Sequence, residues 1–233
     1  MAERPIFIPA PESPELVKEI SIRLMWHPGF VLSQKRKNID ALHESAARAG
    51  YAPLLEVSTK SEEKVGQRLS AFNLKVRSDL LGEMPLEMAF QGSKVFEGGG
   101  PFNDLYRVKD PRDAKRDARL RQSGPLKGFK FGNLWFPLQP KTAFYDWLYI
   151  NALHEHRDWL RKHILHYAGF TDIEFNPERS INCQARSCAL LVTLLKKRWI
   201  DDAVSSPQAF LRLLSSHDYE PARVHQQESI FRS

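Results

Sequence analysis

Cysteine is scarce in this chain of 233 residues, which contains only Cys183 and Cys188. The two lie five residues apart in a predicted helix, which favours packed free thiols over a disulfide or a metal site. No uninterrupted apolar run approaches the ~18 residues that a membrane-spanning helix needs. Residues 1–5 also lack the charged start and apolar core of a secretory signal. We therefore expect a protein of the cytoplasm with no membrane partner.

Several catalytic and nucleotide-binding motifs are missing as well. The chain has no Walker motif, no Gly-x-Gly-x-x-Gly and no Gly-x-Ser-x-Gly. Four histidines crowd residues 154–166, but only His163 and His166 have the spacing of neighbours on a helix. No carboxylate or cysteine completes a recognised metal-binding pattern there. The sequence predicts no metal and no cofactor.

What the chain does have is enough apolar sequence for a sizeable core and an excess of positive charge. Hydrophobic residues make up 42%, and no long polar linker divides the chain. The formal net charge is +6 and the isoelectric point is about 9.3. This basicity favours an anionic partner such as nucleic acid or a phosphorylated ligand, without identifying one.

Hydrophobic spacing predicts an α+β fold that is predominantly helical. Alternation over residues 17–25 indicates a strand, helical spacing over 33–49 a helix, and 52–57 a second strand. We interpret residues 1–60 as a strand–helix–strand extension with a small sheet, packed on a main domain of residues 61–233. At the boundary between the two, Thr59 and Glu62 form a capping box for a helix. Gly132-Asn133 predicts a hairpin between aromatic runs, and residues 141–168 predict one long helix or two consecutive ones.

Glu87, Gln91 and Lys94 stand at positions i, i+4 and i+7 of a segment that begins at Pro85. At about 3.6 residues per turn, these positions stack on one face of a helix. Proline suits the first helical position, and the glycines at 98–100 cannot sustain a helix. The sequence thus predicts a short helix with a carboxylate, an amide and an amine on one face. The alternative is a solvated face with no further role.

Two motifs in this region resemble the NADAR family of N-glycosidases. Residues 68–75, Arg-Leu-Ser-Ala-Phe-Asn-Leu-Lys, are similar to the family's Leu-Ser-Asn-Phe motif. Residues 86–94, Leu-Glu-Met-Ala-Phe-Gln-Gly-Ser-Lys, are similar to its Val-Glu-His-x-Phe-Gln-Ala-x-Lys signature. Met88 in place of the usual His, the long N-terminal portion and residues 180–186 most resemble the antitoxin branch. That branch accompanies DNA ADP-ribosyltransferase toxins of the DarT family.

The resemblance implies that residues 61–233 form a NADAR-like catalytic domain. The implied enzyme hydrolyses the bond between ADP-ribose and guanine in ADP-ribosylated DNA, releases ADP-ribose and acts as antitoxin to a DarT-family toxin. The residues leave two alternatives open. One is an N-glycosidase of a small phosphoribosyl-amine metabolite, and the other is a non-catalytic module that binds nucleic acid or masks the toxin.

Chemical roles follow for the two ionisable residues of the signature. Departure of a base from a sugar passes through an oxocarbenium-like state, which the Glu87 carboxylate would stabilise or assist by acid/base catalysis. Lys94 would attack the anomeric carbon after ring opening, or else bind a phosphate or hydroxyl group. The other substrate-binding candidates are the polar Ser70, Asn73 and Gln91 and the aromatic Phe72, Phe90 and Trp147.

A further acid, Asp146, lies in the strongly apolar stretch 144–153. Because a buried unpaired carboxylate is costly, Asp146 should face solvent, pair with a cation or line a polar pocket. The stretch resembles the Asp-Trp segment that heads a late helix in NADAR proteins. That resemblance implies Asp146 as a second catalytic carboxylate.

Residues 110–121 predict a basic helix capped by Asp110, with Pro111 in its first position. Its cations recur at i, i+3, i+4 and i+7 and form a stripe of Arg112, Lys115, Arg116 and Arg119. A phosphate backbone could lie along such a stripe, which makes these residues candidates for nucleic-acid binding. The alternative is a solvated face with internal ion pairs.

Overall fold

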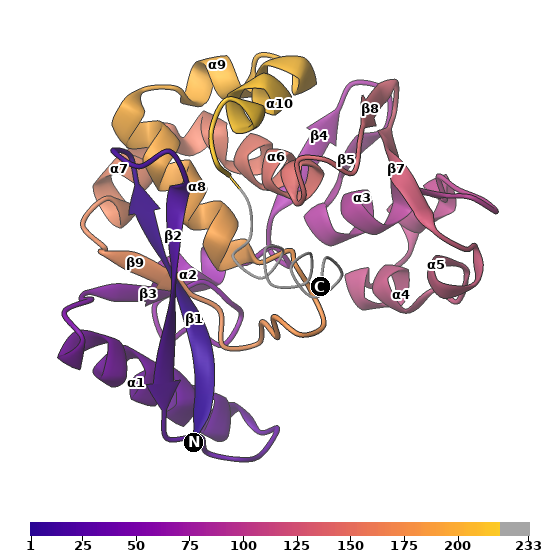
Figure 1. Cartoon of the computed structure of the whole chain (residues 1–233). Coiled ribbons are helices and arrows are strands. Elements are labelled where there is room, and N and C mark those ends of the chain that lie inside the picture. The colour runs from indigo at the N-terminus through magenta and orange to yellow at the C-terminus, as the bar shows by residue number, and fades with distance from the viewer. Residues whose placement is uncertain (220–233) are drawn as a thin grey trace, which may run out of the picture.

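The computed structural model describes residues 1–219 and has an α+β fold, as the sequence predicts. Over these residues more of the chain is helix than strand, by a modest margin. A long buried helix lies against a four-stranded sheet in one part of the fold, and the two smaller sheets lie with several short helices in another (Figure 1). Among these helices, none combines the length and apolarity that crossing a membrane requires.

The largest sheet has the strand order β2-β1-β9-β3. Its strands are β1 (Ala2–Ala10), β2 (Leu16–Leu24), β3 (Leu54–Glu56) and β9 (Gly169–Thr171). β1 and β2 form a long antiparallel hairpin, whereas β3 runs parallel to β9. Helix α1 (Leu32–Arg48) packs on β2 through an apolar stripe that includes Ile39 and Leu42. The expected strands and helix of the N-terminal segment are thus confirmed, and β1 is an additional strand.

β9 ties the N-terminal segment to the rest of the chain, because it lies between β1 and β3. The sheet is therefore built from both sides of the expected boundary at residue 60, and that boundary stays a prediction. The expected capping box at Thr59 and Glu62 is wrong. Helix α2 (Lys64–Arg68) begins after Glu63, and no side chain caps it.

Helix α8 (Gln184–Lys197) is the centre of the core, with twelve of its fourteen residues buried. It packs on β1 and β9 on one side and on helix α6 (Ala143–Leu153) on another. α6 is itself almost wholly buried, which agrees with its lack of a polar face. A 3-10 turn at His154–His156 and helix α7 (Arg157–Ile164) follow, so residues 141–168 hold two helices. Helices α9 (Ile200–Val204) and α10 (Pro207–Ser215) complete this part of the fold.

The other two sheets lie beside helix α3 (Leu86–Gly92) (Figure 1). Strands β4 (Lys75–Ser78) and β5 (Gly82–Pro85) pair as a hairpin that leads directly into α3. Strands β6 (Lys94–Phe96), β7 (Leu126–Phe131) and β8 (Leu134–Phe136) form the third sheet. The β7–β8 turn contains Gly132 with a φ of 59°, so the predicted hairpin is confirmed. A 3-10 helix (Asn103–Arg107) and helices α4 (Pro111–Arg116) and α5 (Arg119–Gln122) connect β6 to β7.

Candidate functional site

A cavity of about 1200 Å³ lies between these elements. Its wall comes from six stretches of sequence: residues 58–59, 70–72, 87–94, 115–129, 137–145 and 172–184. Cavities that bind small molecules commonly measure ~300–1000 Å³, so this one has room for a large nucleotide-like ligand. Both motifs that carry the family resemblance contribute to the wall.

Helix α3 contributes Glu87, Phe90 and Gln91 to the cavity wall, although all seven of its residues are buried. The Glu87 carboxylate is only 6% exposed and accepts a hydrogen bond of 2.8 Å from Gln91 Nε2. Gln91 Oε1 is buried and has no hydrogen-bond partner among residues 1–219. Because buried polar atoms are normally paired, an unpaired amide oxygen at a cavity wall indicates a place for a ligand donor.

Lys94 is not on this helix, so the predicted i, i+4, i+7 face is wrong at its third member. α3 ends at Ser93, whose hydroxyl donates to the Ala89 carbonyl, and Lys94 opens β6. Lys94 nevertheless lines the same cavity as Glu87, with Nζ 4.9 Å from the centroid of the Phe90 ring. The structure thus brings the carboxylate, the amide and the amine together by a helix-to-strand junction.

The environment of Lys94 favours its neutral form more than water does. Burial and the nearby charge of Lys115 lower the pKa of Lys94 to about 8, although the negative charge of Glu87 opposes the shift. A neutral amine is the form that attacks carbon. A useful fraction of Lys94 is therefore nucleophilic near neutral pH.

Aromatic and small polar side chains complete this part of the wall. Phe90 stacks against Phe129 at 5.5 Å and meets Tyr145 edge-on at 5.2 Å. Phe72 is 38% exposed at the cavity and is available for stacking. Ser70 is buried and donates to Gln184 Oε1 across 3.3 Å. These placements bring Ser70, Phe72 and Phe90 to the cavity.

Asn73 and Trp147, by contrast, do not line this cavity. Asn73 donates to the Gln67 carbonyl and lies in a separate cleft of about 670 Å³. Trp147 is buried in the core against Phe136, with ring centroids 5.1 Å apart. Neither Asn73 nor Trp147 is placed to contact a ligand in the main cavity directly.

Asp146 also lies outside the cavity wall. It accepts hydrogen bonds from Thr142 Oγ1, Ser187 Oγ and Tyr219 Oη at 2.6, 2.5 and 3.0 Å, and Arg186 Nη1 is 3.9 Å away. Burial raises the pKa of Asp146, and Arg186 opposes that shift. Of the three expected environments, Asp146 has the cation partner and does not line the pocket. The network around it holds α6 to α8.

The predicted basic stripe is broken, because Asp117 adopts an extended conformation between α4 and α5. Asp110 does cap α4, accepting from the Arg112 amide at 2.8 Å. Arg119 is occupied by Asp104 at 2.6 Å and Asp117 at 2.9 Å. The four cations therefore do not share one helix face. Lys115 lines the cavity together with Arg121, whereas Arg112 and Arg116 are exposed outside its wall.

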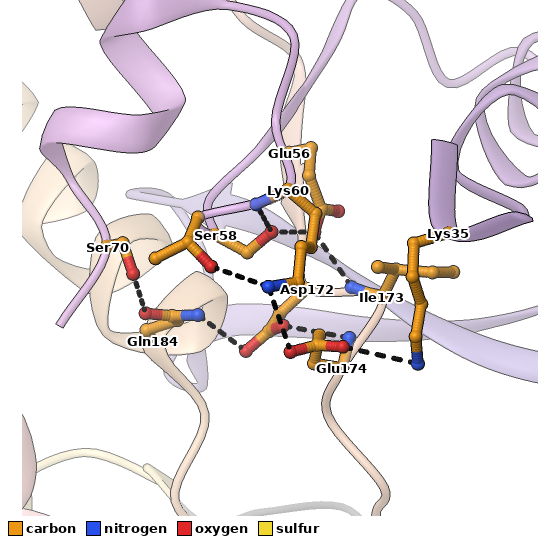
Figure 2. Close-up of polar contacts among 10 residues, drawn as sticks. Lys35, Glu56, Ser58, Lys60, Ser70, Asp172, Ile173, Glu174 and Gln184 are labelled. Carbon is orange, nitrogen blue, oxygen red and sulfur yellow. Dashed lines mark hydrogen bonds and ion pairs between the residues drawn. The ribbon is translucent and has the colours of Figure 1, made fainter. Parts of the chain in front are cut away.

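A second carboxyl group at the cavity, Asp172, was not among the predicted site residues. Asp172 Oδ2 accepts from Gln184 Nε2 at 2.9 Å (Figure 2). Gln184 Oε1 in turn accepts from the Ala71 amide at 2.7 Å. Burial and the charge of Glu56 raise the pKa of Asp172 to about 7. The sequence did contain one indication of this site, since Asp172 is an acid that directly follows the strand β9.

The cavity, with its buried carboxylate, unpaired amide oxygen and lysine of lowered pKa, has the volume and the polar groups to hold a polar, nucleotide-sized ligand. A family model described as DarT1-associated NADAR antitoxin matches residues 2–224. The chain therefore belongs to this family, and both the resemblance and its antitoxin branch are confirmed. The family is of the N-glycosidase type, and its name associates it with a DarT1 toxin. No curated protein matches the chain.

Proposed function

We propose that this antitoxin hydrolyses the N-glycosidic bond between ADP-ribose and guanine in ADP-ribosylated DNA. It thereby reverses, in the cytoplasm, the modification made by its partner toxin. The observation that carries this proposal is the convergence of Glu87, Gln91 and Lys94 on one cavity. The size of that cavity and the exposed ring of Phe72 suit an ADP-ribosyl group.

Glu87 acts on the charge that develops at the sugar. When the base departs, positive charge spreads over the anomeric carbon and the ring oxygen. A carboxylate that is only 6% exposed interacts with this charge more strongly than one in water does. Gln91 fixes the orientation of Glu87 and offers its free Oε1 to a ribose hydroxyl.

Lys94 takes part either covalently or as a ligand. In the covalent route, the sugar ring opens and Lys94 Nζ bonds to the anomeric carbon while the base nitrogen leaves with a proton. Water then hydrolyses the imine, which frees the lysine and ADP-ribose. The lowered pKa of about 8 supports this route, since it leaves part of the amine neutral. In the other route, Lys94 holds a hydroxyl or a phosphate.

DNA approaches along the cations at the cavity edge. Lys115 and Arg121 line the cavity beside Lys94. Arg112 and Arg116 extend the positive surface on α4. We assign phosphate contacts to this group, which binds a backbone without reading its sequence.

The test is release of ADP-ribose from an oligonucleotide that carries ADP-ribosylated guanine. Wild type should release it, whereas Glu87→Gln and Lys94→Ala should be slowed by about 100-fold or more. The Arg119→Gln variant is a matched control, because Arg119 is paired with Asp104 and Asp117. Equal release by all four proteins would remove Glu87 and Lys94 from the chemistry. No release by wild type would overturn the proposed activity itself.

A further inference from the structure

The chain carries a pair of neighbouring acids, separate from α3, one of which lines the cavity. Asp172 follows β9 and lines the cavity, and Glu56 ends the neighbouring strand β3. Because β3 and β9 are parallel and Glu56 is in register with Thr171, the two carboxyl groups come to the same edge of the sheet. Figure 2 shows them linked to the same short stretch of chain. Two like charges buried this closely cannot both ionise cheaply.

The hydrogen bonds assign the negative charge to Glu56. Its carboxylate accepts from Ser58 Oγ at 2.6 Å, Thr171 Oγ1 at 2.7 Å and the Ile173 amide at 3.0 Å. Burial raises the pKa of Glu56 as well, but its three hydrogen-bond donors oppose that shift, whereas Asp172 has only two donors. Asp172 is therefore the member of the pair that keeps a proton near neutral pH.

The two hydrogen bonds of Asp172 also direct that proton. Oδ1 accepts from the Glu174 amide at 3.0 Å, and Oδ2 accepts from Gln184 Nε2 at 2.9 Å. Both partners are N–H donors, so neither can receive a proton from Asp172. Among residues 1–219 no acceptor for it is recorded, and the space beside Asp172 is the cavity.

Other titratable groups around Asp172 leave this arrangement intact. The charge of Glu174 is balanced by Lys35 at 3.2 Å and Lys60 at 4.0 Å (Figure 2). Burial raises the pKa of Cys183 and of Tyr145 well above their ordinary values, so both stay neutral. Burial lowers the pKa of His43 to about 4, and this ring meets Glu56 only through Thr171. Glu56 is thus the charge that controls Asp172.

We propose that Asp172 is the general acid of this site, which donates its carboxyl proton to the nitrogen of the departing base. This inference rests on the proposed N-glycosidase function. It assigns the sugar to Glu87 and Lys94 on one wall of the cavity and the departing base to Asp172 on another. The C–N bond breaks as the Asp172 proton passes to the base nitrogen. A water oxygen, or Lys94 Nζ in the covalent route, bonds to the anomeric carbon, and the proton that nucleophile loses passes to Glu87. Solvent then returns a proton to Asp172 and removes one from Glu87.

Two substrates separate this role from a structural one. Wild type and Asp172→Asn are compared in single turnovers on the ADP-ribosylated oligonucleotide and on a 4-nitrophenyl glycoside of ADP-ribose. The phenolate of the second substrate leaves without a proton. General acids contribute ~10²–10⁴-fold, so the variant should lose about 100-fold or more on the oligonucleotide and only a few-fold on the glycoside. Similar losses on both substrates, or none on the oligonucleotide, would overturn the role of Asp172.

The pH profile supplies a second readout. Asp172 must be protonated to act, so oligonucleotide cleavage should fall as the pH rises through about 7. Glu56→Gln removes the charge that raises the pKa of Asp172, and the fall should move to lower pH. A fall that stays in place in a folded Glu56→Gln protein would contradict the proposal. Should that variant not fold, the two-substrate comparison decides the question alone.

Gln184→Met is the matched control for positioning. It removes the link from Asp172 to the Ala71 amide but leaves the acid in place. Because Gln184 directs the Asp172 proton, this variant should slow the oligonucleotide more than the glycoside, but by a smaller factor than Asp172→Asn does. An equal loss on both substrates would mean that Gln184 does not position the acid, and a loss on the oligonucleotide larger than that of Asp172→Asn would contradict the role of Asp172. In every comparison, wild-type release from the oligonucleotide shows separately that the proposed function holds.

Discussion

Glu87 and Asp146 are both buried carboxylates, and the difference between them lies in their partners. Asp146 is 1% exposed, accepts three hydroxyl hydrogen bonds and has Arg186 beside it, all away from the cavity. Glu87 accepts one hydrogen bond, from Gln91, among residues 1–219 and lines the cavity. A saturated carboxylate stabilises the fold, whereas an unsaturated one at a cavity is available to a ligand. Burial alone therefore does not identify a catalytic acid.

The largest expected effect is the loss of activity on changing Glu87. Glu87→Gln keeps the shape and a hydrogen-bond acceptor for Gln91 but removes the negative charge that stabilises the oxocarbenium-like state. The rate of ADP-ribose release should fall by about 10²–10⁴-fold, while the free energy of unfolding changes by less than about 1 kcal/mol. Single-turnover assays and urea unfolding measure the two quantities. A stability loss as large as the rate effect would give Glu87 the structural role assigned to Asp146.

Removing Asp146 should give the opposite pattern. Asp146→Ala leaves the buried guanidinium of Arg186 without its anion, and breaking a buried pair in this way costs about 3–5 kcal/mol. The free energy of unfolding is obtained from the midpoint and slope of urea denaturation. Arg186→Met alone and the double variant complete a double-mutant cycle. If the double variant is as unstable as the sum of the singles, the two side chains do not interact.

A smaller effect concerns the pH dependence of Lys94. If the neutral amine attacks the sugar, borohydride trapping of an imine with free ADP-ribose, which needs no departing base and so no proton from Asp172, should increase as the pH rises through about 8. Lys115 lowers the pKa of Lys94, so Lys115→Met should move this rise to higher pH. Mass spectrometry of the trapped protein gives the yield. An unmoved rise would show that Lys115 does not influence the amine, and an adduct on Lys94→Ala would place the bond elsewhere.

The smallest effect is on DNA binding by the cations. Each phosphate contact contributes roughly 0.7–0.9 to the slope of log affinity against log salt concentration. Arg121→Gln, at the cavity, should reduce the magnitude of that slope by up to the contribution of one phosphate contact, roughly 0.7–0.9. Arg119→Gln should leave the slope unchanged, because that guanidinium is engaged by Asp104 and Asp117. Equal slopes for the two variants would mean that position at the cavity does not select which cations meet DNA.

The sequence predicted local structure well where one short pattern decides it. Alternation in β2, helical spacing in α1 and the Gly132 turn were sufficient for those elements. β1 was missed because Pro5 and Pro9 count against a strand. β1 tolerates them because, beside its hairpin with β2, it pairs with β9 only at Phe7.

At the site, the sequence identified the wall formed by α3 but not the residues of the other walls, such as Asp172. The family signature pointed to Glu87 and Lys94, although helical spacing placed Lys94 on the wrong element. The prediction of a basic stripe on one helix was wrong because Asp117 ends α4 and pairs with Arg119. The spacing of the cations does not reveal that an acid between them interrupts the helix. Asp172 was missed because its partners, Glu56 and Gln184, are brought to it by the β3–β9 pairing and the start of α8. Such convergence is a property of the tertiary fold.

The most direct measurement is a side-by-side comparison of Glu87→Gln and Asp146→Ala, with both the rate of ADP-ribose release and the free energy of unfolding determined for each. We predict that Glu87→Gln loses at least about 100-fold in rate with little change in stability. Asp146→Ala should lose about 3–5 kcal/mol in stability, and its folded fraction should retain most of the rate. If folded Asp146→Ala is instead as inactive as Glu87→Gln, the site is not centred on the α3 wall.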